Sequence, residues 1–358
     1  MSDEVLNTKR SKWRVLVQLV GFLISLGALG WAVSVALREE NRAQLENLQN
    51  ASVGQIMAIV GLSFASVAVN GIIFWVVVRP VHSIRMTDVI STNAIATFLA
   101  YLPFKVSLIA RVTIHKKRDG VPVLMIGAWF AAIAVLMLAV LGPMALVSFV
   151  LKEVTVLWWL SVVGSVVVSV GILIGVARVF YGDRGVRRIA SVGILKGLTE
   201  RDSFAKLHAG FDMIASPFSS SVAGVLRMVD VLAFAGRFLV AASVLGLPIT
   251  GSDALLLGSV YFMIGVLSPF GMLGTREAGT IGAAALFGVS AAAIGEGGAS
   301  PIAAAVVFVT AVEAVVNLGC AGFGVAWLRI GGRSDPTIES EEERRGREDH
   351  AEDAEKRG

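Results

Sequence analysis

The sequence predicts an all-α fold: a polytopic integral membrane helix bundle that contains two re-entrant or broken helical hairpins. Charged residues make up only 16% of the 358 residues, against roughly 25% in soluble domains. The missing charge leaves long stretches without Asp, Glu, Lys or Arg, and one crossing of a bilayer needs about 20 mostly apolar residues. Lys and Arg gather in some of the intervening loops and avoid others, as they do in membrane proteins. The charge-free stretches are 15–37, 47–78, 120–151, 154–177, 254–275 and 278–295.

Charge also divides the chain into three parts. Residues 1–14 hold four basic residues and are expected to form a cytoplasmic N-terminal segment, followed by a single transmembrane domain over 15–330. Residues 331–358 contain ten acidic and six basic residues, too little apolar surface to fold, and are expected to be a disordered charged cytoplasmic tail. A signal peptide is the alternative reading of the first apolar run. Its 23 residues exceed a usual signal core and no small-x-small site follows Leu37, which favours an uncleaved first span.

The first two spans are expected at about 15–37 and 53–78, and the segment that follows, about 88–111, decides the topology. If it crossed the membrane once, the basic loop 111–119 and the seven basic residues of 178–206 would lie outside. If it enters and leaves on one side, the inside loops before the tail hold 17 Lys or Arg and the outside loops three. The ratio favours a re-entrant hairpin that turns near Pro103. An amphipathic segment lying flat on the inner surface satisfies the same count.

The later segments follow the same alternation. Spans at about 121–141 and 156–178 are expected to be separated by Gly142-Pro143 and a short outer loop. A long basic cytoplasmic loop, 179–206, precedes a span at about 220–247. Residues 254–289 start and end outside and are interrupted by the sequence SPFGMLG, and a last span covers about 301–328.

The two interrupted segments indicate an inverted repeat. One opens from the inside and the other from the outside, and each has a proline at its break followed by basic residues. Broken helices in matching places of two oppositely oriented halves are typical of transporters. No residue-level repeat accompanies this pattern, so the inference rests on topology alone. The residues concerned are Pro103 with Lys105 and Arg111, and Pro269 with Arg276.

The sequence SPFGMLGTREAG places Arg276 and Glu277 directly after a break that Gly271 and Gly274 permit. Irregular backbone at membrane depth is tolerated only in protein or beside a water-filled cavity. A helix restarting near Thr275, a plausible N-cap, would add free N–H groups and a positive dipole end to the Arg276 fork. This corner suits a phosphate. Glu277 then either holds Arg276 in place or binds a cation or proton; the alternative is that both charges merely lock the break.

Four further charged residues lie inside the expected spans. Glu313 is in the middle of the last span with Asn317 four residues on, and either Arg276 or Arg237 is its expected partner. Arg227 and Asp230 are three apart, can pair locally and are interpreted as structural. The four histidines are scattered and Cys320 is the single cysteine, so neither a metal site, a cofactor nor an intramolecular disulfide is expected.

Two motifs resemble a known family. GMLGTREAG is similar to the G-x-L-G-x-R-E-A stretch of the transmembrane region of lysylphosphatidylglycerol synthases, a set of flippase-like membrane proteins. NAIATFLAYLPFKVSLIAR resembles that family's first signature through Asn93, Pro103, Lys105 and Arg111. The resemblance covers roughly residues 12–330. The chain departs from the family where glycines and a Glu are usual, and where an Arg is usual in the last span. The residues at those places are Phe104, Ser107, Leu108 and Glu313.

The resemblance implies a translocator that moves an anionic or modified lipid between leaflets of the cytoplasmic membrane, without enzymatic activity, without a cofactor and without nucleic acid. Membrane lipids are the implied partners, together with a separate lipid-modifying enzyme. Two alternatives stay open: a membrane-embedded enzyme or accessory subunit acting on lipid-linked substrates, and a structural or assembly protein. The residues expected to contact a headgroup are Arg276, Glu277, Arg111, Lys105, Arg237 and Glu313, and those expected to shape the breaks are Asn93, Pro103, Pro269, Gly271 and Gly274.

Overall fold

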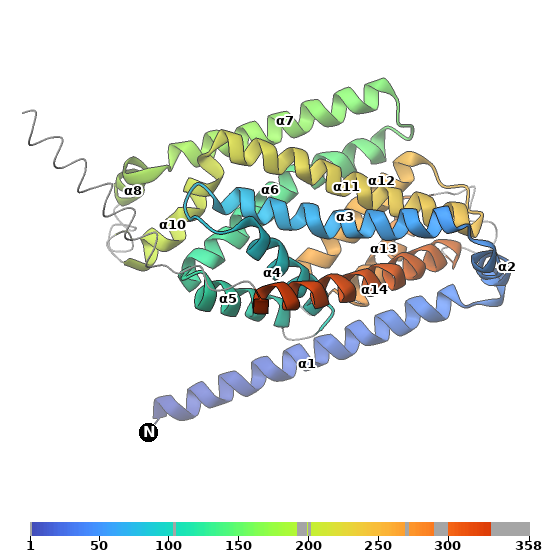
Figure 1. The fold of residues 1–358 in the computed structure, drawn as a ribbon, viewed down its shortest axis with the longest axis horizontal. Coiled ribbons are helices and arrows are strands. Elements are labelled where there is room, and N and C mark those ends of the chain that lie inside the picture. The colour runs from blue at the N-terminus through green and yellow to red at the C-terminus, as the bar shows by residue number, and fades with distance from the viewer. Residues whose placement is uncertain are drawn as a thin grey trace, which may run out of the picture.

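The computed structural model describes residues 2–102, 105–191, 199, 202–268, 272–289 and 300–330, and in these residues all regular structure is helical (Figure 1). Six helices are long and apolar enough to cross a membrane. They are α1 (Ser2–Ala36, apolar from Leu16), α3 (Val53–Val78), α6 (Val123–Val150), α7 (Val156–Val179), α11 (Pro217–Leu245) and α14 (Ser300–Ile330).

These helices lie side by side and their connections alternate between the two ends of the bundle (Figure 1). One end holds the N-terminus and the short helix α8 (Gly182–Ala190). The opposite end holds α2 (Arg42–Asn47), which two 3₁₀ turns flank at Glu39–Asn41 and Leu48–Asn50. We call these the basic end and the opposite end, because the loops of the first contain most of the Lys and Arg residues. The predicted order, in which successive connections alternate between the two ends of the bundle, is confirmed.

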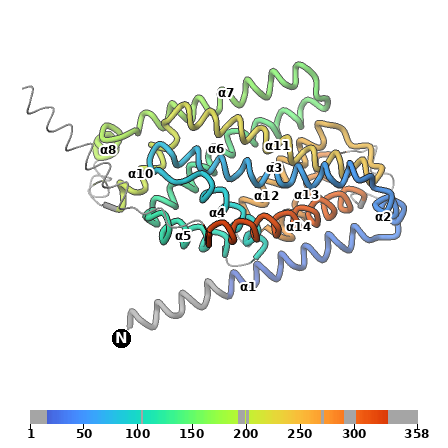
Figure 2. Tube along the Cα trace, in the orientation of Figure 1, coloured from blue at the N-terminus to red at the C-terminus, as the bar shows by residue number. Residues whose placement is uncertain are grey.

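Four short helices form two hairpins that enter the bundle from opposite ends (Figures 1 and 2). The first hairpin consists of α4 (Met86–Leu99) and α5 (Val106–Arg118) and starts at the basic end. The second hairpin consists of α12 (Gly251–Leu267) and α13 (Thr275–Leu286) and starts at the opposite end. At 1.5 Å per residue, even the 17 residues of α12 span about 26 Å, less than the roughly 30 Å of a hydrocarbon core. Neither hairpin therefore crosses the membrane.

The hairpins belong to two halves with the same order of elements: α3–α4–α5–α6 and α11–α12–α13–α14. In each half a long helix is followed by two short ones and another long one, and the second half runs in the reverse direction (Figure 2). The packing repeats as well. Helix α4 packs on α3 of its own half and on α14 of the other, and α12 packs on α11 of its own half and on α6 of the other. This exchange is the arrangement that an inverted repeat produces.

Three expected details of local structure were wrong: a loop at Gly142-Pro143, a loop throughout 179–206, and Thr275 as an N-cap. Gly142 and Pro143 do not form a loop but lie inside α6, which continues to Val150. A proline is tolerated there because a membrane helix loses only one or two backbone hydrogen bonds at it and neighbouring groups compensate. The basic region 179–206 is partly helical, since it contains α8 and the start of α10 (Asp202–Ala215), which packs on α6 and α7. The helix after the second break starts at Thr275, so its N-cap is Gly274.

The apolar core lies between α6, α11, α12 and α14, and the outer face of α7 is left exposed. In the most apolar stretch of α7, only 22% is buried inside the protein. This fits a helix that faces lipid on most of its circumference. The two hairpins contact each other beside this core, through Met272 and Ala100. That position gives the charged residues near the tips their significance.

Candidate functional site

The tips of the two hairpins touch each other in the middle of the bundle. The backbone N–H of Met272 donates a hydrogen bond to the carbonyl oxygen of Ala100 at 3.2 Å. Beside it, the Arg276 guanidinium lies 4.0 Å from the ring centre of Tyr261 and 5.7 Å from that of Tyr101. Tyr101 also accepts a hydrogen bond from Asn317 on α14 at 3.0 Å. The site is thus built from segments that are far apart in the sequence and that only the tertiary fold brings together.

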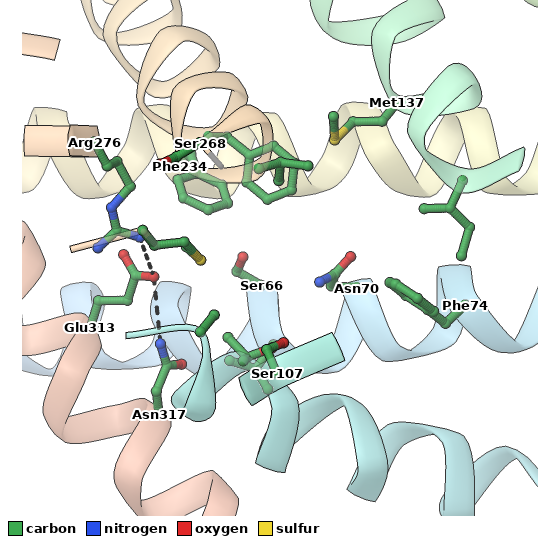
Figure 3. A pocket seen from close by; sticks show the side chains of 18 of the residues that line it. Ser66, Asn70, Phe74, Ser107, Met137, Phe234, Ser268, Arg276, Glu313 and Asn317 are labelled. Carbon is green, nitrogen blue, oxygen red and sulfur yellow. Dashed lines mark hydrogen bonds and ion pairs between the residues drawn. The ribbon is translucent and has the colours of Figure 1, made fainter. Parts of the chain in front are cut away.

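A cavity of about 290 Å³ opens beside this tip contact. Helix α3 lines one wall with Ser66, Asn70 and Phe74, and Phe234 of α11 and Met137 of α6 lie on the other side (Figure 3). Its charged lining residues are Lys105, Arg111, Arg227, Arg237, Arg276 and Glu313. Five of the six residues predicted to contact a headgroup therefore line one cavity.

A cluster of four buried charges closes one end of the cavity; we call Arg237, Arg276, Glu277 and Glu313 the charge cluster. Glu313 accepts from Arg276 at 3.1 Å through Oε1 and lies 3.3 Å from Arg237 through Oε2. Figure 3 shows the Glu313 carboxylate between Arg276 and Asn317. The sequence predicted one of the two arginines as partner of Glu313, and the structure brings it together with both. Unpaired charges at membrane depth cost about 2.5–3.5 kcal/mol on insertion scales, which this pairing offsets.

Glu277 is the predicted contact residue that does not line the cavity. Its side chain accepts from the backbone N–H of Gly274, from Arg276 Nε at 3.2 Å and from Thr310 at 2.9 Å. Glu277 is fully buried, as is Arg276. Of the roles considered for Glu277, the geometry matches the one in which it holds Arg276 in place, and it adds a cap to the first turn of α13.

The residues of the first motif form the other end of the cavity. Arg111 donates to the side-chain oxygen of Asn93 at 2.8 Å, and its guanidinium lies 4.3 Å from the ring centre of Phe74. Asn93, which lies on α4, in turn donates to the Val67 carbonyl on α3 at 3.1 Å. Its side chain therefore links α5 to α3. Arg111 thus faces neutral groups and aromatic faces. Lys105 precedes α5 in a left-handed conformation with φ of 51° and has an exposed side chain.

The breaks are described only in part. Gly274 has φ of +86°, and a side chain there would lie 1.7 Å from the Ser25 carbonyl oxygen of α1. Glycine is therefore required both by the backbone conformation and by the close approach of α1. The predicted break residues Pro103, Pro269 and Gly271 lie outside the described residues.

Sequence reasoning missed one polar wall of the cavity. Arg227 donates to Asp230 at 2.6 Å and to the side-chain oxygen of Asn70 at 3.0 Å, and Ser66 donates to the same aspartate. The Arg227–Asp230 pair was predicted, but not that its arginine lines the cavity. A signal was present: Ser63, Ser66 and Asn70 recur at spacings of three and four in an otherwise apolar span, which places them on one helix face.

The lining is positively charged. It contains five basic residues and, among the described residues, one acidic residue, Glu313. Arg227 is paired with Asp230, and the charge cluster is balanced by its two glutamates. Lys105 and Arg111 then add uncompensated positive charge, and two nitrogens of Arg237, Nε and Nη2, are buried without a hydrogen-bond partner. Within the described part of the chain, no three His, Cys, Asp or Glu side chains gather closely enough to hold a metal ion.

Fold and site together define a polytopic helical membrane protein with two opposed re-entrant hairpins around a polar, cationic cavity. The family model described as the lysylphosphatidylglycerol synthase TM region matches residues 18–297. The chain belongs to this family. The match includes both hairpins but ends before Glu313. No match was found among the curated proteins or among the solved structures.

Proposed function

We propose that this protein moves an anionic or modified lipid between the two leaflets of the cytoplasmic membrane. The observation that carries the proposal is the cationic cavity at the meeting point of two hairpins that enter from opposite ends. A headgroup in transit needs polar partners at membrane depth, because water is absent there. Lys105, Arg111 and Arg237 offer such partners to a phosphate. The lipid in the family's printed name supports a membrane lipid as the substrate class.

The size of the cavity supports passage of a headgroup with the acyl chains left in the bilayer. Its volume of about 290 Å³ is at the lower end of the roughly 300–1,000 Å³ of small-molecule sites. The two hairpin tips separate the cavity from the opposite end through the Met272–Ala100 hydrogen bond. In the proposed cycle, the hairpins part on one side and then on the other, as the broken helices of inverted-repeat transporters do. The sequence contains no ATP-binding motif, so the movement is passive or ion-coupled.

We propose no catalytic step. A carboxylate that is free to exchange a proton with the substrate is one common device of general acid–base chemistry. The carboxylates near the cavity, Asp230, Glu277 and Glu313, are each held by an arginine. A separate enzyme would therefore supply any modified lipid. The basic end is assigned to the cytoplasm by the positive-inside rule, with both termini there.

Reconstitution tests the proposal directly. Purified protein in vesicles with a fluorescent lipid in both leaflets should make the inner-leaflet probe accessible to dithionite, a membrane-impermeant quencher. Arg111→Gln should slow this exchange about tenfold, a loss of roughly 1.4 kcal/mol of interaction with the headgroup, whereas Arg111→Lys should retain more of it. The matched control is Lys117→Gln, which removes an exposed charge of α5 that does not line the cavity. If wild-type protein accelerates the exchange of no lipid, the proposal is wrong.

A further inference from the structure

The cavity is lined by five basic residues and, among the described residues, one acidic residue. We infer that the lipid this chain accommodates has a headgroup with net negative charge and no ammonium group. The inference rests on the proposed function and narrows its substrate class. The inference separates lipids whose phosphodiester or phosphomonoester headgroup carries no amine from zwitterionic and aminoacylated lipids, whose headgroups add an ammonium group to the phosphate.

The first step concerns the carboxylate that an ammonium group would require. Glu313 is the acidic residue among the described lining residues, and both of its oxygens are occupied. Oε1 accepts from Arg276 at 3.1 Å, and Oε2 accepts from Tyr261 at 3.0 Å and lies 3.3 Å from Arg237. An ammonium group has only donors. To gain a carboxylate partner it would have to displace an arginine from Glu313, and that buried arginine would lose its ion pair with Glu313.

The second step concerns Asp230, a carboxylate that contacts the lining residues Arg227 and Ser66. One of its oxygens accepts from Arg227 at 2.6 Å and the other from Ser66. Asp230 is 1% exposed and does not line the cavity. Residues 103–104 and 269–271, which lie outside the described part of the chain, are Pro, Phe and Gly, and none of them is acidic.

The third step concerns guanidinium groups that can donate further hydrogen bonds to an anion. Arg237 is 1% exposed, and its Nε and Nη2 are buried without a hydrogen-bond partner. Arg111 is 7% exposed and has a neutral amide and aromatic rings as its partners. Buried polar groups rarely lack a hydrogen-bond partner, so a buried donor without one indicates that an acceptor binds there. A phosphate oxygen supplies acceptors to donors of this kind, and Arg binds it through a planar fork.

The fourth step concerns the rim of the cavity. Leu102, Leu108 and Val266 line it and are 44%, 40% and 45% exposed. The charged residue at this apolar rim is Lys105, whose side chain is exposed. Exposed apolar side chains at membrane depth face lipid. A lipid can therefore approach with its acyl chains in the bilayer and its phosphate toward Lys105. A cationic headgroup would meet Lys105 first and be repelled, since charges interact strongly where the dielectric constant is low.

The experiment compares four lipids with identical acyl chains in vesicles containing the full chain. They are phosphatidylglycerol, phosphatidic acid, phosphatidylethanolamine and lysylphosphatidylglycerol. Two readouts are taken: leaflet exchange by dithionite quenching, and retention of each lipid by the detergent-solubilised protein in native mass spectrometry. The two anionic lipids are expected to be retained and exchanged at least about tenfold better than the two that carry an ammonium group, a difference of roughly one decade in affinity. Equal or better retention of either amine-bearing lipid overturns the inference.

Two variants keep the inference falsifiable if a buried substitution unfolds the protein. Ser107→Glu adds a carboxylate to the lining four residues before Arg111 on α5, so it should lower phosphatidylglycerol retention and raise that of lysylphosphatidylglycerol. The control Thr113→Glu adds the same charge at an exposed position of α5 outside the lining and should change neither. Lys105→Gln, at the exposed rim, should reduce the preference without loss of folding.

The two proposals fail in different ways. Exchange of all four lipids at one rate would overturn the inferred selectivity and leave the translocation proposal standing. Selective retention of the anionic lipids with no exchange of any lipid would overturn translocation and support the inferred headgroup class.

Discussion

The backbone N–H of Met272 donates a hydrogen bond to the carbonyl oxygen of Ala100 at 3.2 Å, across 172 positions of sequence and between hairpins that enter from opposite ends. In the proposed cycle, this contact between the two hairpins separates the cavity from the opposite end of the bundle. A lipid headgroup in the cavity can pass to the other side only if the two tips separate. The contact is therefore the element whose movement the proposed function requires.

A reversible crosslink tests that requirement. Ala100→Cys with Met272→Cys, in a Cys320→Ser background, places two thiols on residues whose backbones are hydrogen-bonded, so that they can be joined by a disulfide or by a short thiol crosslinker. Oxidation should stop leaflet exchange and reduction should restore it, because the bond holds the tips together. The measurement is dithionite quenching before and after each treatment. Each single-cysteine protein is the control and should exchange at one rate throughout; full exchange by the crosslinked protein contradicts this separation.

Gly274 provides a prediction about the break before α13. Gly274→Ala should lower the free energy of unfolding by at least about 2 kcal/mol, because φ of +86° disfavours a side chain and the new atom would overlap the Ser25 carbonyl of α1. Thermal unfolding in detergent micelles measures the loss. The control lies on the same helix: Gly282→Ala faces open space and should stabilise α13 by up to about 1 kcal/mol. Similar melting temperatures for the two variants would contradict the close packing of α13 on α1.

Most of the architecture could be predicted from sequence because hydropathy and loop charge are local signals. They located the six spans, both hairpins and the parity of the connections. They failed where a helix is apolar around its whole circumference: nothing in the residues around Pro143 indicated that α6 continues to Val150. The glycines and threonine of the second break also left the first helical residue ambiguous by one position.

The site was predictable residue by residue but not in its connections. Charge at membrane depth singles out Arg237, Arg276 and Glu313 without any structure. It cannot tell whether Glu313 pairs with one arginine or two, because α11, α13 and α14 meet only in the folded bundle. Tyr101 and Tyr261 were missed for the same reason. Their rings flank Arg276 from different hairpins, and no local spacing links them.

Asp88 fastens the base of the first hairpin. It is 1% exposed and contacts Arg85 at 3.0 Å, Arg118 at 3.2 Å and the Trp327 ring nitrogen at 3.3 Å. Asp88→Asn should therefore loosen the end of α5, raising deuterium uptake there while the uptake of α13 stays unchanged. Hydrogen–deuterium exchange with mass spectrometry makes the comparison. Asp183→Asn, which changes an exposed aspartate of α8 at the same end of the bundle, should leave α5 as it is; unchanged uptake in Asp88→Asn would show that the ion pairs do not hold the hairpin.

Labelling from one side of the membrane tests the proposed orientation. Single cysteines at exposed Lys117 and exposed Arg42, each in a Cys320→Ser background, lie at the basic and opposite ends. An impermeant maleimide added to intact cells should label Arg42→Cys alone, and Lys117→Cys only after permeabilisation. Labelling of both from outside would show that α4–α5 crosses the membrane. The reverse pattern would invert the assigned orientation and leave the fold unchanged.

Arg276 and Glu313 should be strongly coupled in stability. Arg276→Met leaves Glu277 and Glu313 buried with fewer partners, and breaking a buried ion pair from one side costs about 3–5 kcal/mol. Glu313→Gln alone should also destabilise, because Arg237 and Arg276 then share a neutral acceptor. The double variant should cost less than the sum of the two singles by at least about 1 kcal/mol, as expected for residues in direct contact.

Thermal unfolding of the wild type, the two single variants and the double variant gives this coupling energy. An exposed ion pair serves as the control. Arg42 and Glu46 form an ion pair with side chains that are 72% and 64% exposed, so the corresponding cycle should yield well under about 1 kcal/mol. Additive losses for Arg276 and Glu313 would show that the charge cluster is not held by that contact. A coupling energy much larger than that of the exposed pair would show that the contacts within the charge cluster stabilise the bundle around the two hairpins.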